Sequence, residues 1–164
     1  MAICLNTKST YNLFQMLVND TFFVDKSAII EKLSARINTP NRYICITKPR
    51  RFGKTSVLNM LGAYYCKAYD SKVLFDGLKI AKTAAYAAHL NQYNVVHLSM
   101  NSIPDDGNAY EDYMKLFKNA IRRDILEAYP QLKEQEFNSL SEMLVATDDE
   151  FIFIIDEWDY IFSH

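Results

Sequence analysis

The clearest pattern along the chain is a helical repeat of apolar side chains between residues 108 and 130. Apolar residues recur at spacings of three and four, which places them on one helix face: Tyr110, Tyr113, Met114, Phe117, Ile121 and Ile125. Pro130 ends the pattern, because proline lacks the amide hydrogen that a helix interior needs. The repeat predicts one long helix with a buried apolar face.

Weaker helical patterns occur elsewhere in the chain. Shorter helices are predicted at residues 27–37, 54–70, 83–90 and 137–144. Ser27 is a favourable N-cap for the first of these, since its hydroxyl can accept a hydrogen bond from an amide of the first turn. Residues 71–81 carry apolar anchors that fit either a hairpin or a loop, and the sequence leaves both open.

Three short apolar runs predict strands, at residues 43–46, 94–98 and 151–155. The first reads Tyr-Ile-Cys-Ile and the last Phe-Ile-Phe-Ile-Ile. Runs that are apolar on both faces are typical of buried parallel strands. Strands that alternate with helices predict an α/β domain with a mostly parallel sheet.

Composition and charge narrow the class of protein. The chain has 164 residues, 49% of them hydrophobic, and this favours one globular domain over disorder. Its net charge of −2 gives no general basic field for nucleic acid. No apolar run approaches the ~20 residues that span a bilayer. Three cysteines without a secretory leader are interpreted as packing residues, and the predicted location is the cytoplasm.

Candidate chemistry begins in residues 46–56, ITKPRRFGKTS, between the first predicted strand and a predicted helix. Gly53 lets the backbone approach a phosphate, the Lys54 ammonium reaches phosphate oxygens, and the Thr55 hydroxyl is a ligand for Mg²⁺. A helix beginning at Lys54 adds its N-terminal amides and the positive end of its dipole. The segment therefore predicts a phosphate-binding loop.

The loop departs from the strict pattern G-x-x-x-x-G-K-[ST], because Lys48 stands where the first glycine is required. Pro49 has no amide hydrogen to donate, whereas Arg50 and Arg51 bring cations that can replace lost backbone donors. The sequence leaves two roles open for these arginines. They either neutralise phosphate charge, or they face solvent and bind nucleic acid or a partner domain. The residues expected to contact the nucleotide are Pro49, Arg50, Arg51, Phe52, Gly53, Lys54, Thr55 and Ser56.

A pair of carboxylates follows the third predicted strand. Ligands of open α/β sheets bind at the carboxyl ends of strands, where Asp156 and Glu157 lie. Asp156 is predicted to hold Mg²⁺ and Glu157 to polarise an attacking water, so that Lys54, Asp156 and Glu157 are the expected catalytic residues. The bland alternative, that acidic residues merely end a strand, is disfavoured by the Gly53-Lys54-Thr55 sequence. Asp159 is a further carboxylate without an assigned role.

Three segments together resemble the AAA-ATPase-like family of bacterial and archaeal P-loop NTPases: FFVDKSAII (residues 22–30), ITKPRRFGKTS (46–56) and FIFIIDEWD (151–159). The family shares the missing first glycine, with arginine where this chain has Lys48 and tyrosine where it has Trp158. The resemblance implies a three-layer α/β sandwich that takes ATP and Mg²⁺. It implies that Lys54 and Thr55 bind phosphate and Mg²⁺, and that Asp156 and Glu157 carry metal binding and water activation. Asp25 and Lys26 lie in the family's first motif, either near the nucleotide base or in a turn with a satisfied ion pair.

Many members of that family continue into a helical region and a restriction-endonuclease-like domain, and neither follows in this sequence. In P-loop ATPases with such an acidic pair, a later strand separates the acidic strand from the loop strand. Residues 1–164 are therefore expected to be the N-terminal part of one P-loop NTPase domain, truncated after the acidic strand. Alone, this part is expected to hydrolyse ATP poorly, because residues 151–155 would present an unpaired edge or pair wrongly with residues 43–46.

Two functions follow from the sequence. The first is a Mg-dependent ATPase or nucleotide switch in a full-length protein, with nucleotide as ligand and a missing C-terminal domain as partner. The second is a noncatalytic fragment that binds protein or nucleic acid through the surface of Arg50 and Arg51.

Overall fold

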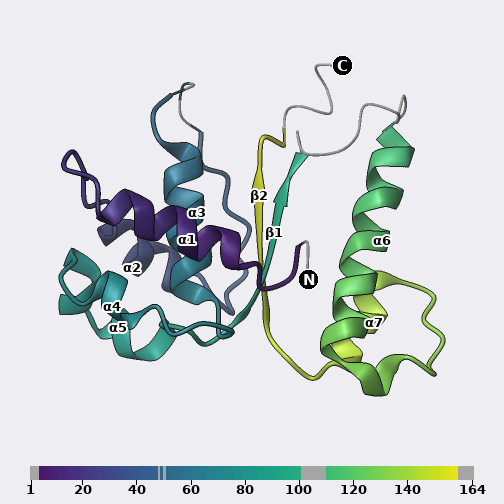
Figure 1. Cartoon of the computed structure of the whole chain (residues 1–164). Coiled ribbons are helices and arrows are strands. Elements are labelled where there is room, and N and C mark those ends of the chain that lie inside the picture. The colour runs from purple at the N-terminus through teal and green to yellow at the C-terminus, as the bar shows by residue number, and fades with distance from the viewer. Residues whose placement is uncertain (1–3, 48, 50, 101–109, 159–164) are drawn as a thin grey trace. The chain divides into compact units, whose positions relative to one another are not determined.

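The computed structural model describes residues 4–47, 49, 51–100 and 110–158. The chain forms two compact units, each with its own core. The strand unit comprises Met1–Thr7 and Asn94–His164, and the loop unit comprises Lys8–Tyr93. Together they give a mixed α/β chain, as the sequence predicts (Figure 1).

The strand unit contains a parallel pair of strands. β1 (Asn94–Ser99) and β2 (Phe151–Asp156) are in register from Asn94 opposite Phe151 to Ser99 opposite Asp156. Parallel strands need a long crossover connection, which here holds α6 (Tyr110–Ala128), η3 (Pro130–Leu132) and α7 (Leu140–Ala146). The two later predicted strands, their direction, the long helix and the short helix after it are thus confirmed.

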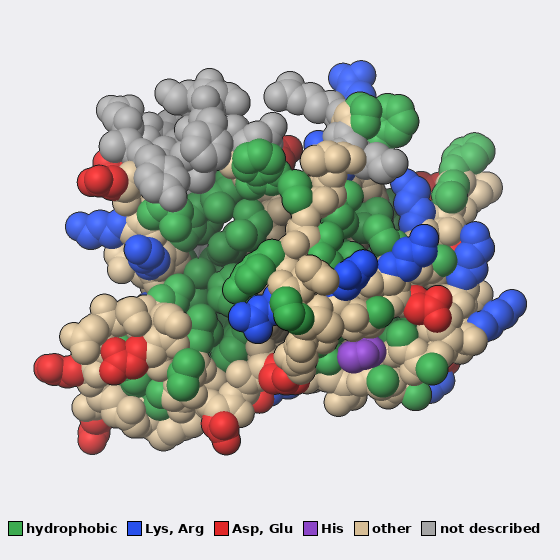
Figure 2. Space-filling view, turned by 180° about the vertical axis from the view of Figure 1, so that it is seen from behind, with side chains coloured by type: hydrophobic (Ala, Val, Ile, Leu, Met, Phe, Trp, Pro, Cys, Tyr) green, Lys and Arg blue, Asp and Glu red, His purple; other side chains and the backbone are tan. Residues whose placement is uncertain are grey.

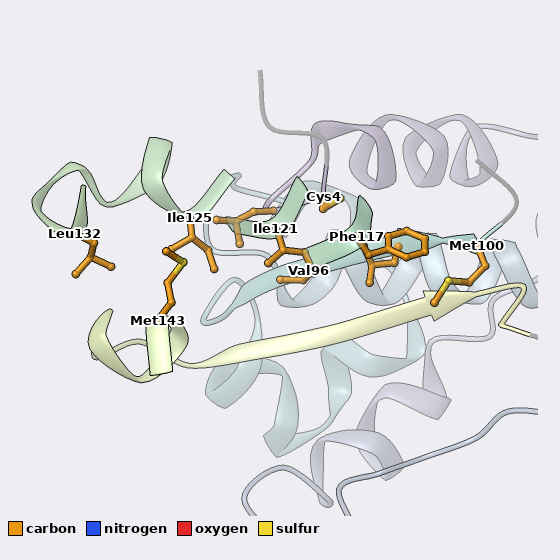
Figure 3. Packing of buried hydrophobic residues seen from close by; sticks show 10 residues of the cluster. Cys4, Val96, Met100, Phe117, Ile121, Ile125, Leu132 and Met143 are labelled. Carbon is orange, nitrogen blue, oxygen red and sulfur yellow. The ribbon is translucent and has the colours of Figure 1, made fainter. Parts of the chain in front are cut away.

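The core of the strand unit forms between α6 and β1 (Figure 3). Phe117, Ile121 and Ile125 from the predicted apolar face of α6 are all buried in it. Its other buried members are Cys4, Leu5, Val96, Leu98, Met100, Leu132 and Met143. The side chains of Tyr110 and Tyr113, predicted for the same helix face, lie outside the described part.

A buried carboxylate attaches the start of the chain to this core. The Asp124 carboxylate on α6 is 1% exposed, and its Oδ2 accepts hydrogen bonds from the amides of Cys4 at 2.6 Å and Leu5 at 3.1 Å. Leu5 also forms an antiparallel bridge with Val96. The N-terminal segment therefore adds pairing to the edge of β1 that β2 leaves open.

The loop unit is helical. Its elements are α1 (Lys8–Val18), α2 (Ala28–Ser34), α3 (Lys54–Tyr65), α4 (Lys72–Phe75), η1 (Lys79–Lys82) and α5 (Ala84–His89). The helix α1 was not predicted. Ser27 precedes α2 as predicted, but its hydroxyl accepts the Ile80 amide at 3.1 Å and makes no cap hydrogen bond.

Aromatic side chains from three helices form the core of the loop unit. The Phe14 ring stacks on Phe75 with 4.9 Å between centroids, and Tyr64 meets Phe75 edge-on at 5.2 Å. Burial raises the pKa of the neighbouring Tyr65 to about 12. Tyr64 and Tyr65 both belong to this core, since they are 0% and 3% exposed.

Several features differ from the sequence-based expectations, among them residues 71–81, which contain α4 and most of η1 where a hairpin or a loop was expected. Residues 43–46 form no strand, and Tyr43 and Ile44 are 84% and 48% exposed. A strand exists through its hydrogen bonds to a neighbour, and within the described residues only β1 and β2 pair as strands. The prediction was therefore wrong there, and Cys45 in this run is exposed rather than packed, unlike Cys4 and Cys66.

The strand β2 is also less buried than its sequence predicts. Phe153 and Ile155 point to the same side of the strand and are each 42% exposed. Hydrophobic side chains are visible at the surface of the chain (Figure 2). A strand that is apolar on both faces favours burial of both faces. Burial of a face also requires another element to pack against it, and the face with Phe153 and Ile155 stays partly exposed.

The helix α3 ends earlier than predicted, at Tyr65 instead of Tyr69 or Asp70. Cys66 adopts an extended conformation with ψ 120° and forms a parallel bridge with Tyr93. The Lys67 amide then donates to the Tyr93 carbonyl at 2.8 Å. Backbone pairing of Cys66 and Lys67 with Tyr93 therefore replaces the last predicted turn of the helix.

Substituting Gly62 tests the close approach of α1 and α3. A Cβ at Gly62 would lie 2.8 Å from the Cβ of Thr10, which is 2% exposed and cannot move easily. We expect Gly62→Ala to lower the free energy of unfolding by about 1–2 kcal/mol, because overpacking exceeds the ~1 kcal/mol by which alanine favours a helix. Gly77→Ala, with no atom within 4 Å, is the matched control and should change little. Urea denaturation that finds Gly62→Ala more stable than wild type would contradict the packing.

Substituting Asp124 tests the attachment of the N-terminal segment. We expect Asp124→Ala to cost on the order of 2–4 kcal/mol, because two buried amides lose their acceptor. The matched control is Asp112→Ala, which removes an exposed carboxylate from the same helix and should cost under about 1 kcal/mol. Hydrogen exchange should show faster exchange of the Cys4 and Leu5 amides in Asp124→Ala alone. Equal exchange in both variants would show that Asp124 does not hold this segment.

Candidate functional site

The predicted phosphate-binding loop makes a sharp turn into α3. Gly53 precedes the helix with φ 75° and ψ 31°, the left-handed conformation that glycine adopts without steric cost. Arg51, two residues earlier, is left-handed as well, with φ 68°. Positive φ values on both sides of Phe52 make the backbone irregular directly before Lys54. Lys48 and Arg50 of the same segment lie outside the described residues.

The remaining loop residues lie at or near the surface. Arg51, Phe52 and Thr55 are exposed, and Lys54 is half-buried as the first residue of α3. Pro49 is exposed and Ser56 half-buried. The first turn of a helix presents amides that lack acceptors within the helix, together with the positive dipole end. The accessible residues therefore surround a position that favours an anion.

The structure also brings Lys26 to this loop. Its Nζ donates to the Phe52 carbonyl at 3.5 Å. The preceding Asp25 accepts hydrogen bonds from the amides of Ser27 and Lys79, at 2.8 Å each. From the sequence, both residues fit either a contact with the nucleotide base or a turn with an ion pair. Asp25 and Ser27 are held against η1, and the Lys26 side chain between them reaches Phe52 and Gly53. This proximity is visible only in the folded chain.

The acidic pair ends β2 in two different environments. Asp156 is the last residue of the strand and is 6% exposed, whereas Glu157 is exposed. The Glu157 amide donates to Oδ1 of Asp156 at 2.9 Å. Glu157 is left-handed with φ 51°, which is uncommon for a residue with a side chain. Both carboxylates thus lie at the carboxyl edge of the parallel pair, one buried and one accessible.

His97 also lies on this sheet face, where the sequence predicts a packed or surface histidine in preference to a ligand. It pairs with Ile154, and side-chain alternation puts it on the same face as Asp156. Its Nε2 is buried and, among the described residues, has no hydrogen-bond partner. Burial holds the pKa of His97 below its ordinary value, although the negative charge of Asp156 acts in the opposite direction. In the sequence, the feature that sets His97 apart is its position two residues before the end of β1, the strand that pairs with the Asp156 strand.

The predicted site residues, together with Lys26 and His97, divide between the two units. The loop unit brings together Lys26, Gly53, Lys54 and Thr55, and the strand unit brings together His97, Asp156 and Glu157. Asp159 lies outside the described residues. Within the described part, no three His, Cys, Asp or Glu residues cluster as metal ligands, and no helix has both the length and the apolarity of a membrane span.

Comparison with known proteins assigns the chain to a family. No curated protein and no solved structure matches it. The family model described as Predicted AAA-ATPase matches residues 10–163, which include the loop, the helix α3 and the acidic end of β2. Because this match covers nearly the whole sequence, the chain belongs to the predicted AAA-ATPase family, whose members are expected to have a P-loop fold and to bind nucleotide.

Proposed function

We propose that this chain is a P-loop NTPase domain that binds ATP with Mg²⁺ and contributes to a Mg-dependent ATPase or nucleotide switch. The observation that carries the proposal is the sequence Gly53-Lys54-Thr55 at the start of α3, after a left-handed turn, in a member of this family. The finer architecture that we propose is a three-layer α/β sandwich with a mostly parallel sheet. Residues 1–164 would belong to one such domain.

The loop is proposed to hold the phosphates. Gly53 allows a close approach, Lys54 contributes a cation, and the first amides of α3 donate to phosphate oxygens. Exposed Arg51 adds a second cation, and exposed Phe52 adds an apolar surface beside it. The proposed contact set is completed by Pro49, Arg50, Thr55 and Ser56.

Thr55 and Asp156 are the residues that we propose for Mg²⁺. Their hydroxyl and carboxylate oxygens are of the ligand class that this ion takes, so the donor set fits. When bound, the ion would neutralise charge on the phosphates. The buried position of Asp156 limits its motion, which suits a metal ligand, because a fixed oxygen needs little reorganisation.

Glu157 is proposed to accept a proton from the attacking water. Its exposed carboxylate can reach water, in contrast to the buried Asp156. Its left-handed backbone is strained for glutamate, and such strain occurs preferentially at functional positions. The two carboxylates therefore suit different roles.

The exposure of Arg51 and Phe52 also supports the second candidate, a noncatalytic surface that binds protein or nucleic acid. An arginine and an aromatic ring on one turn are common in such contacts. The two candidates make different demands on Lys54, because only phosphate binding requires it.

Substituting Lys54 tests the nucleotide site. We expect Lys54→Ala to weaken binding of Mg-ATP by roughly 10–100-fold, because a charge-assisted contact to phosphate is lost. Isothermal titration calorimetry measures this, with Lys32→Ala, an exposed lysine of α2, as the matched control. Chelation of Mg²⁺ should also weaken binding by wild type. If Lys54→Ala binds as wild type does, the proposed site is wrong.

Substituting Glu157 tests the proposed chemistry. Glu157→Gln keeps the size of the side chain but removes the base. In a form of the protein that hydrolyses ATP, we therefore expect turnover to fall roughly 100-fold or more while binding stays within about twofold. Glu150→Gln, an exposed glutamate beside the first residue of β2, is the control. Phosphate release under saturating Mg-ATP measures the difference. Turnover by Glu157→Gln equal to that of the control would remove Glu157 from the mechanism.

A further inference from the structure

Lys26 makes a specific contact with the backbone that leads into α3. Its Nζ donates to the Phe52 carbonyl at 3.5 Å. A Cβ built on Gly53 would lie 2.9 Å from the same Nζ. The ammonium therefore occupies the space that any side chain at position 53 would need. The left-handed φ favours glycine at position 53, and a side chain there would also displace the flexible end of Lys26 from the Phe52 carbonyl.

The segment that carries Lys26 is held on both sides. Asp25 accepts the Lys79 amide at 2.8 Å, and Ser27, which is 0% exposed, accepts the Ile80 amide at 3.1 Å. Burial tends to raise the pKa of Asp25, but hydrogen bonds from Ser27 and Lys79 outweigh it and hold the pKa below its ordinary value. Two consecutive amides of η1 thus fix the residues on either side of Lys26, and the origin of its side chain is constrained.

The contact has a consequence for the direction of one amide. In a trans peptide the carbonyl of Phe52 and the N–H of Gly53 point in opposite directions. An ammonium that holds the carbonyl therefore turns the Gly53 amide away from Lys26. Backbone anion sites need successive N–H groups turned inward and carbonyl groups turned outward.

We propose that Lys26 is a positioning residue of the loop, which holds the Phe52 carbonyl so that the Gly53 amide is directed at a phosphate of the bound nucleotide. This inference rests on the proposed function, since it names a further residue of the same site. It assigns to Lys26 a backbone contact, whereas Lys54 is assigned to the phosphates themselves. Phosphate alone should therefore report the effect, without a nucleoside.

The sequence offers a direct spectroscopic probe of this peptide. The chain has four glycines, and only Gly53 follows a phenylalanine. Labelling phenylalanine with ¹³C at the carbonyl carbon and glycine with ¹⁵N gives a single correlation, from the Phe52 carbonyl to the Gly53 amide. The spectrum is recorded for the full chain alone and with Mg-ATP or inorganic tripolyphosphate.

The variants separate a hydrogen bond from mere side-chain bulk. Lys26→Met keeps a long, unbranched side chain but removes the hydrogen-bond donor and the charge, and Lys26→Arg retains both the donor and the charge. Lys32→Met, on an exposed lysine of α2, is the matched control, and Lys54→Ala tests the site itself. Thermal unfolding should show Lys26→Met within about 2 °C of wild type, because an exposed side chain contributes little stability.

We expect Lys26→Met to shift the correlation in the ligand-free chain and to weaken tripolyphosphate binding roughly three- to tenfold, the scale of one weak hydrogen bond. The ligand-induced shift of the Gly53 amide should shrink in this variant. Lys26→Arg should bind within about twofold of wild type, and Lys32→Met should match wild type in every measurement.

Three results would overturn the inference, and they are distinguishable. If Lys54→Ala loses binding while Lys26→Met binds as wild type does, Lys26 has no role and the proposed function stands. If Lys26→Met loses affinity without any shift in the ligand-free spectrum, Lys26 contacts phosphate directly and does not position the peptide. If wild type binds neither ligand, the proposed function fails and this inference fails with it.

Discussion

Short polar side chains that pair with buried backbone groups hold each unit of this chain in shape. Asp124 serves the amides of Cys4 and Leu5 in the strand unit. In the loop unit, Asn91 donates to the Cys66 carbonyl at 2.7 Å and accepts the Ser71 amide at 3.1 Å. An unpaired buried polar group costs roughly 1–3 kcal/mol. Each of these hydrogen bonds therefore stabilises a segment that lacks the hydrogen bonds of a helix or strand.

The candidate functional groups lie where regular structure ends. Lys54 begins α3 directly after left-handed Gly53, and Glu157 follows the last residue of β2 with a left-handed backbone of its own. The ends of helices and strands leave amides and side chains available for a ligand, while the body of each element is packed. His97 has a buried, unpartnered Nε2 among the described residues. It is the exception to the pairing rule and lies on the sheet face that carries Asp156.

The sequence by itself determined the elements whose signal is local. The spacing of Phe117, Ile121 and Ile125 predicted the apolar face of α6, and all three side chains are buried. The runs at residues 94–98 and 151–155 predicted β1 and β2, and the residues from Lys54 onward predicted the start of α3. The motifs at residues 22–30, 46–56 and 151–159 predicted the family. These signals succeed because periodicity and helix-start chemistry involve residues within a few positions of one another.

Only the tertiary structure decided which segments find partners. Residues 43–46 have strand-like composition but no pairing neighbour in the described chain, whereas Leu5, in a segment without a predicted element, bridges to Val96. Lys26 reaches the Phe52 carbonyl across 26 residues, and Ser27 accepts the Ile80 amide across 53. Such contacts depend on the path of the whole backbone, which no local pattern encodes. The sequence therefore determined which residues bear the candidate chemistry, and the fold decided which other residues support them.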